Sequence, residues 1–215
     1  GKCGGPYDGH APRTLGEAFS AAAEFDGPVV VHVLTQKGKG YPPAEQDVEK
    51  HLHDTSVFNP EIGPQPSGSS TPSYTGAFTE AIVKEGEARP ELVAITAAMP
   101  GSTGLLPFEE RFADRFVDVG IAEQHAVTAA AGMAMGGLRP VVAVYSTFLS
   151  RAFDQANLDV GLHDLPVVFC LDRAGITGDD GPSHHGVLDM VLLSKVPTMT
   201  VFAPSSYQEL QVQLH

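Results

Sequence analysis

Apolar residues recur along the chain with two different periods, which predict the elements of an α/β protein. Helical spacing of apolar residues marks 14–25, and the apolar run 29–34 that follows is typical of a strand. From residue 73 onward, short apolar runs alternate with helical stretches. The predicted strands lie at 91–96, 116–120, 140–145, 166–171 and 199–203. The predicted helices lie at 73–89, 107–115, 122–135, 147–163, 187–195 and from 205 onward.

This order predicts the fold class and the division of the chain. Strands that alternate with helices pair in parallel, so we expect an α/β fold, a doubly wound parallel sheet with helices on both faces. A small αβ tail and a linker precede the sheet, because residues 41–72 hold six prolines and few side chains that could pack into a core. We therefore divide the chain into a tail at 1–45, a linker at 46–72 and a sheet domain at 73–215.

Charge and composition narrow the class of partner. The 215 residues include 26 Asp and Glu against 13 Lys and Arg, a net charge of −13, which disfavours nucleic acid and anionic membranes as partners. No apolar run approaches the roughly 20 residues that a membrane-spanning helix needs. Cys170 lies in an apolar run far from Cys3, which favours a buried free thiol over a disulfide and suits a reducing, cytoplasmic setting.

The candidate chemistry lies in loops after strands, since ligands of parallel sheets bind beyond the carboxyl ends of the strands. Glu123 follows one predicted strand and opens a helix, where the helix dipole stabilises a carboxylate. It is either an ordinary acid of a first helical turn or a buried carboxylate directed at a ligand. The small residues at 129–132 would allow close packing behind it. The loops of interest are 97–104, 120–124, 145–151 and 172–186.

The segment after residue 144 offers aromatic and basic side chains. Tyr145 and Phe148 fall at a strand-to-helix turn, where Phe148 either stacks on a planar ligand ring or packs into the core. Arg151 and Asp154 are close enough in sequence to pair across one helical turn, which would be a purely structural role.

The segment 172–186 is a long polar loop after another predicted strand. Its residues fit no dedicated metal motif, and adjacent histidines such as His184 and His185 seldom bind one ion together, so we predict no metal site. Arg173 instead suits a phosphate or carboxylate group. His184 and Asp180 suit contacts to protons and hydroxyl groups.

Five blocks of residues occur in a fixed order along the chain. They are Gly5-Pro6-x-Asp8-Gly9-His10, Lys37-Gly38-x-Gly40-Tyr41-x-Pro43-Ala44-Glu45, Asp118-Val119-x-Ile121-Ala122-Glu123-Gln124-His125-Ala126, Tyr145-Ser146-Thr147-Phe148 and Asp172-Arg173-Ala174-Gly175. Together they resemble the 1-deoxy-D-xylulose-5-phosphate synthases, thiamine-diphosphate enzymes of the transketolase group. The resemblance runs over essentially the whole chain, and the first two blocks separate these synthases from transketolase itself.

The resemblance implies a reaction, cofactors and an assembly. Pyruvate loses carbon dioxide, and its two remaining carbons join the aldehyde of D-glyceraldehyde 3-phosphate to give 1-deoxy-D-xylulose 5-phosphate. This transferase reaction opens the methylerythritol phosphate route to isoprenoids and also feeds thiamine biosynthesis. Thiamine diphosphate and Mg²⁺ are the implied cofactors, a homodimer is the implied assembly, and the bacterial cytoplasm, or otherwise a plastid stroma, is the implied location.

The resemblance also implies roles for single residues in the cofactor site. Glu123 would share a proton with N1′ of the thiamine pyrimidine, and Phe148 would stack on that ring. Ile121 and Lys37 would belong to the same cofactor pocket. From the residues alone, Lys37 in its glycine-rich turn is as consistent with a solvated turn as with an anion contact.

Other implied roles concern the substrates. His53 resembles a linker histidine near the reacting carbons, with His51 as a close rival, and we take it as a catalytic residue beside Glu123. His184 would contact the part of the substrate derived from pyruvate and be catalytic too. The residues implied to line the acceptor site are Tyr145, Arg151, Arg173, Asp180 and His184.

The chain departs from this family in two respects. We find no Gly-Asp-Gly…Asn segment, through which the family binds Mg²⁺ and the diphosphate, so we expect the metal ligands outside this chain. The family's C-terminal domain is not found either. Residues 1–45 would thus be the end of a diphosphate-binding domain and 73–215 an incomplete pyrimidine-binding domain, and the 215-residue chain alone would be inactive.

Two other functions stay open. A beta-type subunit of a thiamine-dependent 2-oxoacid dehydrogenase carries only the pyrimidine-binding domain, although the tail at 1–45 argues against this alternative. A synthase-like domain that is not an enzyme could instead serve dimerisation or regulation. The identity of the product separates the first alternative from a synthase, and titration with thiamine diphosphate and Mg²⁺ addresses the second.

Overall fold

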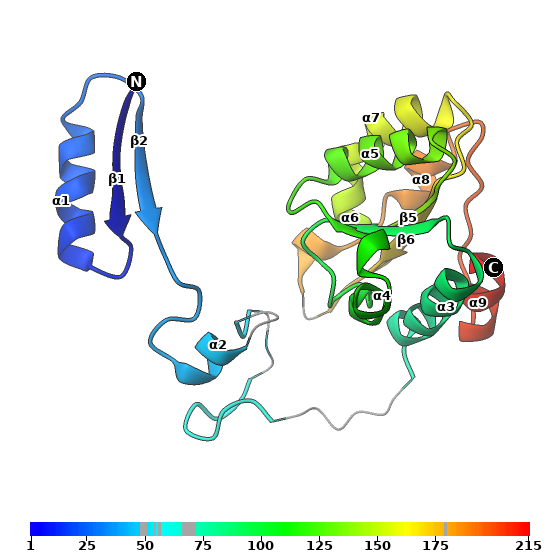
Figure 1. The fold of residues 1–215 in the computed structure, drawn as a ribbon, viewed down its shortest axis with the longest axis horizontal. Coiled ribbons are helices and arrows are strands. Elements are labelled where there is room, and N and C mark those ends of the chain that lie inside the picture. Colours follow the sequence, from blue (N-terminus) through cyan, green and yellow to red (C-terminus); the bar gives the residue numbers. More distant parts are fainter. Residues whose placement is uncertain (48–50, 54, 56, 66–71, 179) are drawn as a thin grey trace. The chain divides into compact units, whose positions relative to one another are not determined.

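The computed structural model describes residues 1–47, 51–53, 55, 57–65, 72–178 and 180–215. The chain separates into two compact units, Gly1–Ser69 and Ser70–His215, each of which is described by itself (Figure 1). Part of the predicted linker, at 48–50, 54, 56 and 66–71, lies outside the described residues, and the boundaries of the linker stay a prediction. Among the described residues, none of the helices has the combination of length and hydropathy that a membrane-spanning segment needs.

The first unit contains a small parallel αβ motif. Its two strands, β1 (Lys2–Asp8) and β2 (Val29–Leu34), pair in parallel and are joined by α1 (Pro12–Ala23). The sequence predicts α1 and β2 but not β1, because β1 contains two glycines and a proline, which are poor strand formers. A short helix, α2 (Pro42–Gln46), begins with proline in its first turn, where the missing N–H costs nothing.

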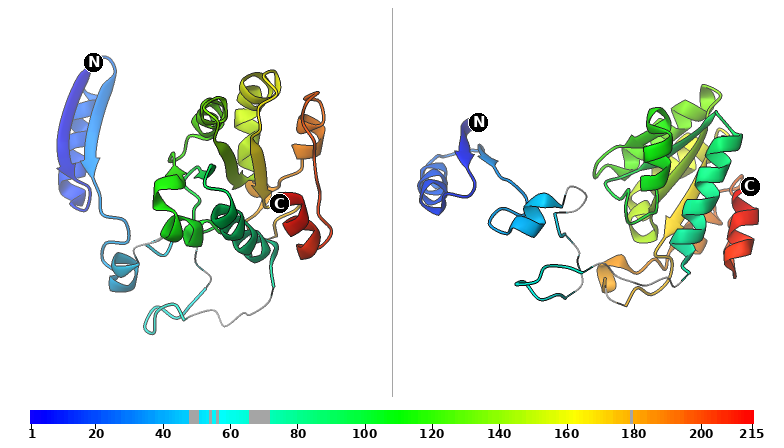
Figure 2. Two further views of the ribbon diagram at one scale, coloured as in Figure 1. Left: turned by 45° about the vertical axis from the view of Figure 1, so that its right-hand side comes forward. Right: turned by 60° about the horizontal axis from the view of Figure 1, so that its bottom comes forward.

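The second unit is built on a four-stranded sheet with the order β4-β3-β5-β6, and all its strand pairs are parallel. The strands are β3 (Leu92–Thr96), β4 (Phe116–Asp118), β5 (Arg139–Tyr145) and β6 (Val168–Asp172). Figures 1 and 2 show helices on both faces of this sheet. The predicted fold class, a parallel α/β sheet covered on both faces, is therefore confirmed.

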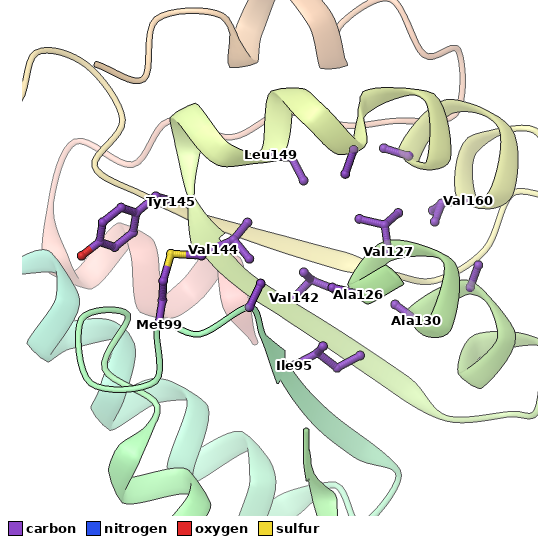
Figure 3. Close-up of a cluster of buried hydrophobic side chains, with 14 of the residues drawn as sticks. Ile95, Met99, Ala126, Val127, Ala130, Val142, Val144, Tyr145, Leu149 and Val160 are labelled. Carbon is purple, nitrogen blue, oxygen red and sulfur yellow. The ribbon is translucent and has the colours of Figure 1, made fainter. Parts of the chain in front are cut away.

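Two buried clusters explain why both faces are covered. Successive strand residues point to opposite faces, so Ile95 and Val142 join one cluster, while Ala94 and Val141 join the other. The first cluster, drawn in Figure 3, packs the sheet against α5 (Glu123–Met135) and the helical segment that follows β5. The second packs it against α3 (Tyr74–Ala88), α4 (Leu106–Arg111) and α9 (Tyr207–Leu214).

Several predicted elements differ in detail. The predicted helix at 147–163 is a series of short turns, α6 (Ser146–Leu149), η2 (Ser150–Ala152), α7 (Phe153–Gln155) and η3 (Ala156–Gly161), the last with π-helical bonding. The predicted helix at 107–115 is α4 followed by η1 (Ala113–Arg115), and the one at 187–195 is reduced to α8 (Asp189–Leu193). A further short helix, η4 (Pro182–His184), lies in the loop after β6.

The predicted strand at 199–203 is wrong. Residues 199–203 form no strand and pair with none, and Phe202 is exposed. An apolar run becomes a strand only where a neighbouring backbone can pair with its N–H and C=O groups, and period alone does not supply that partner.

Candidate active site

The carboxyl ends of β4, β5 and β6 lie at one edge of the sheet because the strands are parallel. Each end leads into a segment that carries candidate chemistry. Glu123 follows β4, Tyr145 ends β5 and Arg173 follows β6 directly. The topology therefore brings together residues that are far apart in the sequence.

Glu123 is the first residue of α5 and is only 3% exposed. Its Oε2 lies 3.5 Å from Nη1 of Arg151, whose side chain is about half exposed at 51%. The turn before Glu123 is held by Asp118, since Oδ1 of Asp118 accepts hydrogen bonds from the backbone N–H of Ala98 at 2.7 Å and of Gly120 at 2.9 Å. The carboxyl group of Glu123 is thus withdrawn from water on a turn held by hydrogen bonds. The cation beside it is Arg151, whose contact with the carboxyl group is long.

Arg151 also connects this acid to a group of aromatic rings. The rings of Tyr145 and Phe148 stack with centroids 5.6 Å apart and an interplanar angle of 10°. The His184 ring meets both edge-on, at centroid distances of 6.1 Å and 5.3 Å respectively. The phenol of Tyr145 is protonated at neutral pH, as is usual for tyrosine, and can donate a hydrogen bond; burial raises its pKa further.

Arg173 also contacts Tyr145, with its guanidinium 4.3 Å from the ring centroid. Its Nη1 donates to Oδ1 of Asp172 and to the carbonyl of Ser102, each at 3.0 Å, and its Nε lies 3.6 Å from Oδ2 of Asp180. Burial lowers the pKa of Arg173, but the charge of Asp172, with Tyr145 and Asp180, outweighs this, and the net pKa is raised. Arg173 is a fixed cation, and its longest contact, to Asp180, is the one that an incoming anion would displace most readily.

The structure brings most of the predicted site residues together. Arg151 links Glu123 to the ring of Phe148, over which its guanidinium lies at 5.8 Å. The remaining contacts join Phe148, Tyr145, His184, Arg173 and Asp180 into one group. The position of Phe148 allowed packing into the core or stacking on a ligand ring. In the structure, Phe148 stacks on Tyr145, which belongs to the buried cluster. Ile121, in contrast, is 80% exposed.

The predicted residues of the first unit are described apart from this group. Lys37 and His53 are exposed in their own unit, so their place in the site stays a prediction. His51 differs from His53 because its Nδ1 lies 3.0 Å from the carbonyl oxygen of Ala44. Among the residues that the structure describes, no three His, Cys, Asp or Glu side chains come close enough to hold a metal ion.

Two residues at this edge were missed by the sequence analysis. Asp118 ends β4 two residues before Gly120, and an Asp followed closely by a glycine is a recognisable turn signal, so its backbone partners could have been suspected. Ser102 accepts from Arg173 through its backbone carbonyl, which no side-chain pattern could have revealed, and its side chain is hydrogen-bonded to Tyr145.

Comparison with known proteins agrees with this geometry. Residues 70–215 match the family model described as "Transketolase, pyrimidine binding domain". The chain is 54% identical over 210 residues to 1-deoxy-D-xylulose-5-phosphate synthase of Mycobacteroides abscessus, covering 98% of this chain and 33% of that protein. It is 53% identical over 207 residues to the synthase of the same name from Corynebacterium diphtheriae, covering 96% and 32%. The chain thus spans about a third of the length of these relatives.

Solved structures show the same fold. A chain described as a split-gene transketolase, an inactive beta4 tetramer, is 29% identical, with a TM-score of 0.58 over 66% of this chain and 46% of that one. Transketolase from Leishmania mexicana is 22% identical, with a TM-score of 0.60 over 69% and 24%. The parallel sheet, the acid after β4 and the matched family model lead to one conclusion: the chain belongs to the family of transketolase pyrimidine-binding domains.

Proposed function

We propose that this chain contributes the pyrimidine-binding domain of a 1-deoxy-D-xylulose-5-phosphate synthase. The enzyme would condense pyruvate, with loss of carbon dioxide, and D-glyceraldehyde 3-phosphate. The observation that carries the proposal is the buried carboxyl group of Glu123, placed through Arg151 beside the ring of Phe148. The synthase relatives support the choice of reaction, since they match 98% of the chain and so include the first unit.

The residues present fit the pyrimidine of thiamine diphosphate. That ring presents a basic nitrogen and a flat face, and the site offers a carboxyl group withdrawn from water and an aromatic ring. When bound, the cofactor supplies a carbon nucleophile that attacks the keto group of pyruvate. Glu123 would hold a proton at N1′ of the pyrimidine, and Arg151 would orient the carboxyl group of Glu123.

The other residues of the site suit the two substrates. The fixed cation of Arg173 would bind the phosphate of glyceraldehyde 3-phosphate, a role for which a guanidinium fork is well shaped. The protonated phenol of Tyr145 would donate a hydrogen bond to a substrate oxygen. His184, edge-on to both rings, would contact the part derived from pyruvate, and Asp180 would bind a hydroxyl group of the acceptor.

Several parts of the proposal concern residues and groups beyond the second unit. Lys37 and His53 would complete the cofactor and substrate sites, and Ile121 would border the pyrimidine. Mg²⁺ would be held by ligands outside this chain, and the enzyme would act as a cytoplasmic homodimer.

The test is the product made by the full-length protein that carries this chain. Supplied with pyruvate, D-glyceraldehyde 3-phosphate, thiamine diphosphate and Mg²⁺, it should form 1-deoxy-D-xylulose 5-phosphate, identified by its mass. The product should disappear in Glu123→Ala and persist in Glu109→Gln, which changes another glutamate in the first turn of a helix. In a parallel reaction that also contains a lipoyl domain, transfer of an acyl group to the lipoyl sulfur would instead indicate a 2-oxoacid dehydrogenase. No reaction in either mixture would favour a module that is not an enzyme.

A further inference from the structure

A pair of side chains next to the candidate site has no part in the chemistry proposed above. Ser146 follows Tyr145 directly and is 1% exposed. Its hydroxyl donates a hydrogen bond to Oδ2 of Asp189, which is 43 residues further along the chain. Asp189 opens α8, just after the loop that carries His184. The bond therefore joins the far end of that loop to the turn that carries the aromatic pair of Tyr145 and Phe148.

The base of the same loop is closed by its own backbone. Gly175 N–H donates to the carbonyl of Gly186 at 2.8 Å, and Gly186 N–H donates back to Gly175 at 2.9 Å. Gly186 also lies directly against Ser146, because a Cβ atom at residue 186 would overlap the hydroxyl oxygen of Ser146. Only glycine permits this approach, so the base of the loop rests on Ser146.

A third contact holds the middle of the loop. The hydroxyl of Thr147 donates to the carbonyl of Ser183 at 3.1 Å, one residue before His184. Two contacts from residues 146 and 147 thus hold the loop whose His184 ring meets Tyr145 and Phe148 edge-on. They add to the Gly175–Gly186 backbone bonds and to a 2.9 Å contact between the Ser183 hydroxyl and Nδ1 of His184.

We propose that Ser146 and Asp189 are positioning residues that hold His184 against the aromatic pair in the orientation needed for the pyruvate-derived part of the substrate. The role of the pair rests on the proposed function of His184. Neither side chain touches the reacting atoms. Their bond fixes a loop, and a displacement of a catalytic group by about 1 Å can cost a large factor in rate.

The test is Ser146→Ala in the full-length protein, a change that removes one hydroxyl and leaves the half-buried Asp189 able to reach water. We expect kcat/KM for pyruvate to fall about tenfold, with the KM for thiamine diphosphate unchanged, because Glu123 does not depend on this loop. Amide hydrogen exchange in residues 175–187 should become faster. A general loss of stability would not lower kcat/KM for pyruvate and leave the KM for thiamine diphosphate unchanged.

Two variants of the acceptor sharpen the test. Asp189→Asn keeps an oxygen that can accept from Ser146, so it should stay within about twofold of the wild type, whereas Asp189→Ala should behave like Ser146→Ala. Thr128→Val is a matched control, since it removes a Thr-to-Asp hydrogen bond of 2.6 Å, to Asp159, elsewhere in the same unit. It should change neither the loop exchange nor the pyruvate kinetics.

The outcomes separate this proposal from the proposed function. Unchanged exchange in Ser146→Ala overturns the positioning role, whatever the activity. Faster exchange with unchanged pyruvate kinetics also overturns it, as does an equal loss for pyruvate and cofactor. A wild-type protein that makes no 1-deoxy-D-xylulose 5-phosphate refutes the proposed function instead, and the exchange measurement still tests the tie between Ser146 and Asp189.

Discussion

Two glutamates of the second unit are buried to nearly the same degree, but their surroundings differ. Glu85, near the end of α3, is 5% exposed, and both its oxygens are engaged: Nη1 of Arg89 donates to one, and Nδ1 of His215 lies 2.8 Å from the other. Glu123 is 3% exposed, and its one partner among the described residues is Arg151 at 3.5 Å.

This difference distinguishes a structural acid from a functional one. Burying a carboxyl group costs free energy unless hydrogen bonds or charges compensate it. Glu85 is compensated within the protein, on the face of the sheet covered by α3 and α9. Glu123 keeps most of its hydrogen-bonding capacity unused at the edge where ligands of parallel sheets bind. The partners of a buried acid, more than its burial, therefore indicate its role.

The largest expected effect follows from replacing Glu123. In the full-length protein, Glu123→Gln should lower turnover at least about 100-fold, because the amide cannot share a proton with the cofactor. The melting temperature should change little, since only a long contact to Arg151 is lost. The measurements are the initial rate of product formation and a thermal unfolding scan. Near-normal turnover would contradict the assignment of Glu123.

Glu85→Gln should show the opposite behaviour. It removes the charge that two neighbours share, so the free energy of unfolding should fall by about 2 kcal/mol while turnover stays within about twofold. Urea denaturation measures the loss. Glu87→Gln is the matched control, because Glu87 pairs with Arg111 at 2.6 Å on the exposed surface, where a pair contributes less than about 1 kcal/mol. If Glu85→Gln and Glu87→Gln lower the free energy of unfolding equally, burial of Glu85 adds nothing to the strength of its contacts.

Asp118 provides a smaller test of the turn before Glu123. Asp118→Ala removes the acceptor of two backbone N–H groups, so Glu123 should be held less firmly and kcat should fall about tenfold. Asp118→Asn keeps an acceptor oxygen and should recover most of the rate. If Asn is as slow as Ala, the charge of Asp118 matters more than its hydrogen bonds.

The smallest expected effect concerns the reactivity of Cys170. Cys170 is a free, partly buried thiol, and burial raises its pKa to about 12, so at pH 8 its thiolate is much scarcer than that of an ordinary cysteine. Iodoacetamide at this pH should modify the exposed Cys3 and leave Cys170 unmodified, as peptide mass analysis would show. Equally fast modification of both cysteines in the folded protein would contradict the packing of β6.

The sequence predicts the structure best where a local signal and the tertiary contact agree. The places of the acid after β4 and of the aromatic residues at the end of β5 are predicted because strand ends can be read from apolar runs followed by polar residues. The prediction fails where packing overrides the period of the apolar residues. The helix predicted at 147–163 is broken into short turns, and Gly161 within it lies so close to Val196 that no larger residue would fit.

The order of the elements, the class of the fold and the strand ends that carry polar residues follow from the sequence, because they depend on neighbours a few positions away. The difference between the two buried glutamates, one with both oxygens engaged and one with a single long contact, and the hydrogen bond of Ser146 to Asp189 depend on tertiary packing. These contacts join residues that are distant along the chain, and their geometry follows from how the sheet and its helices pack.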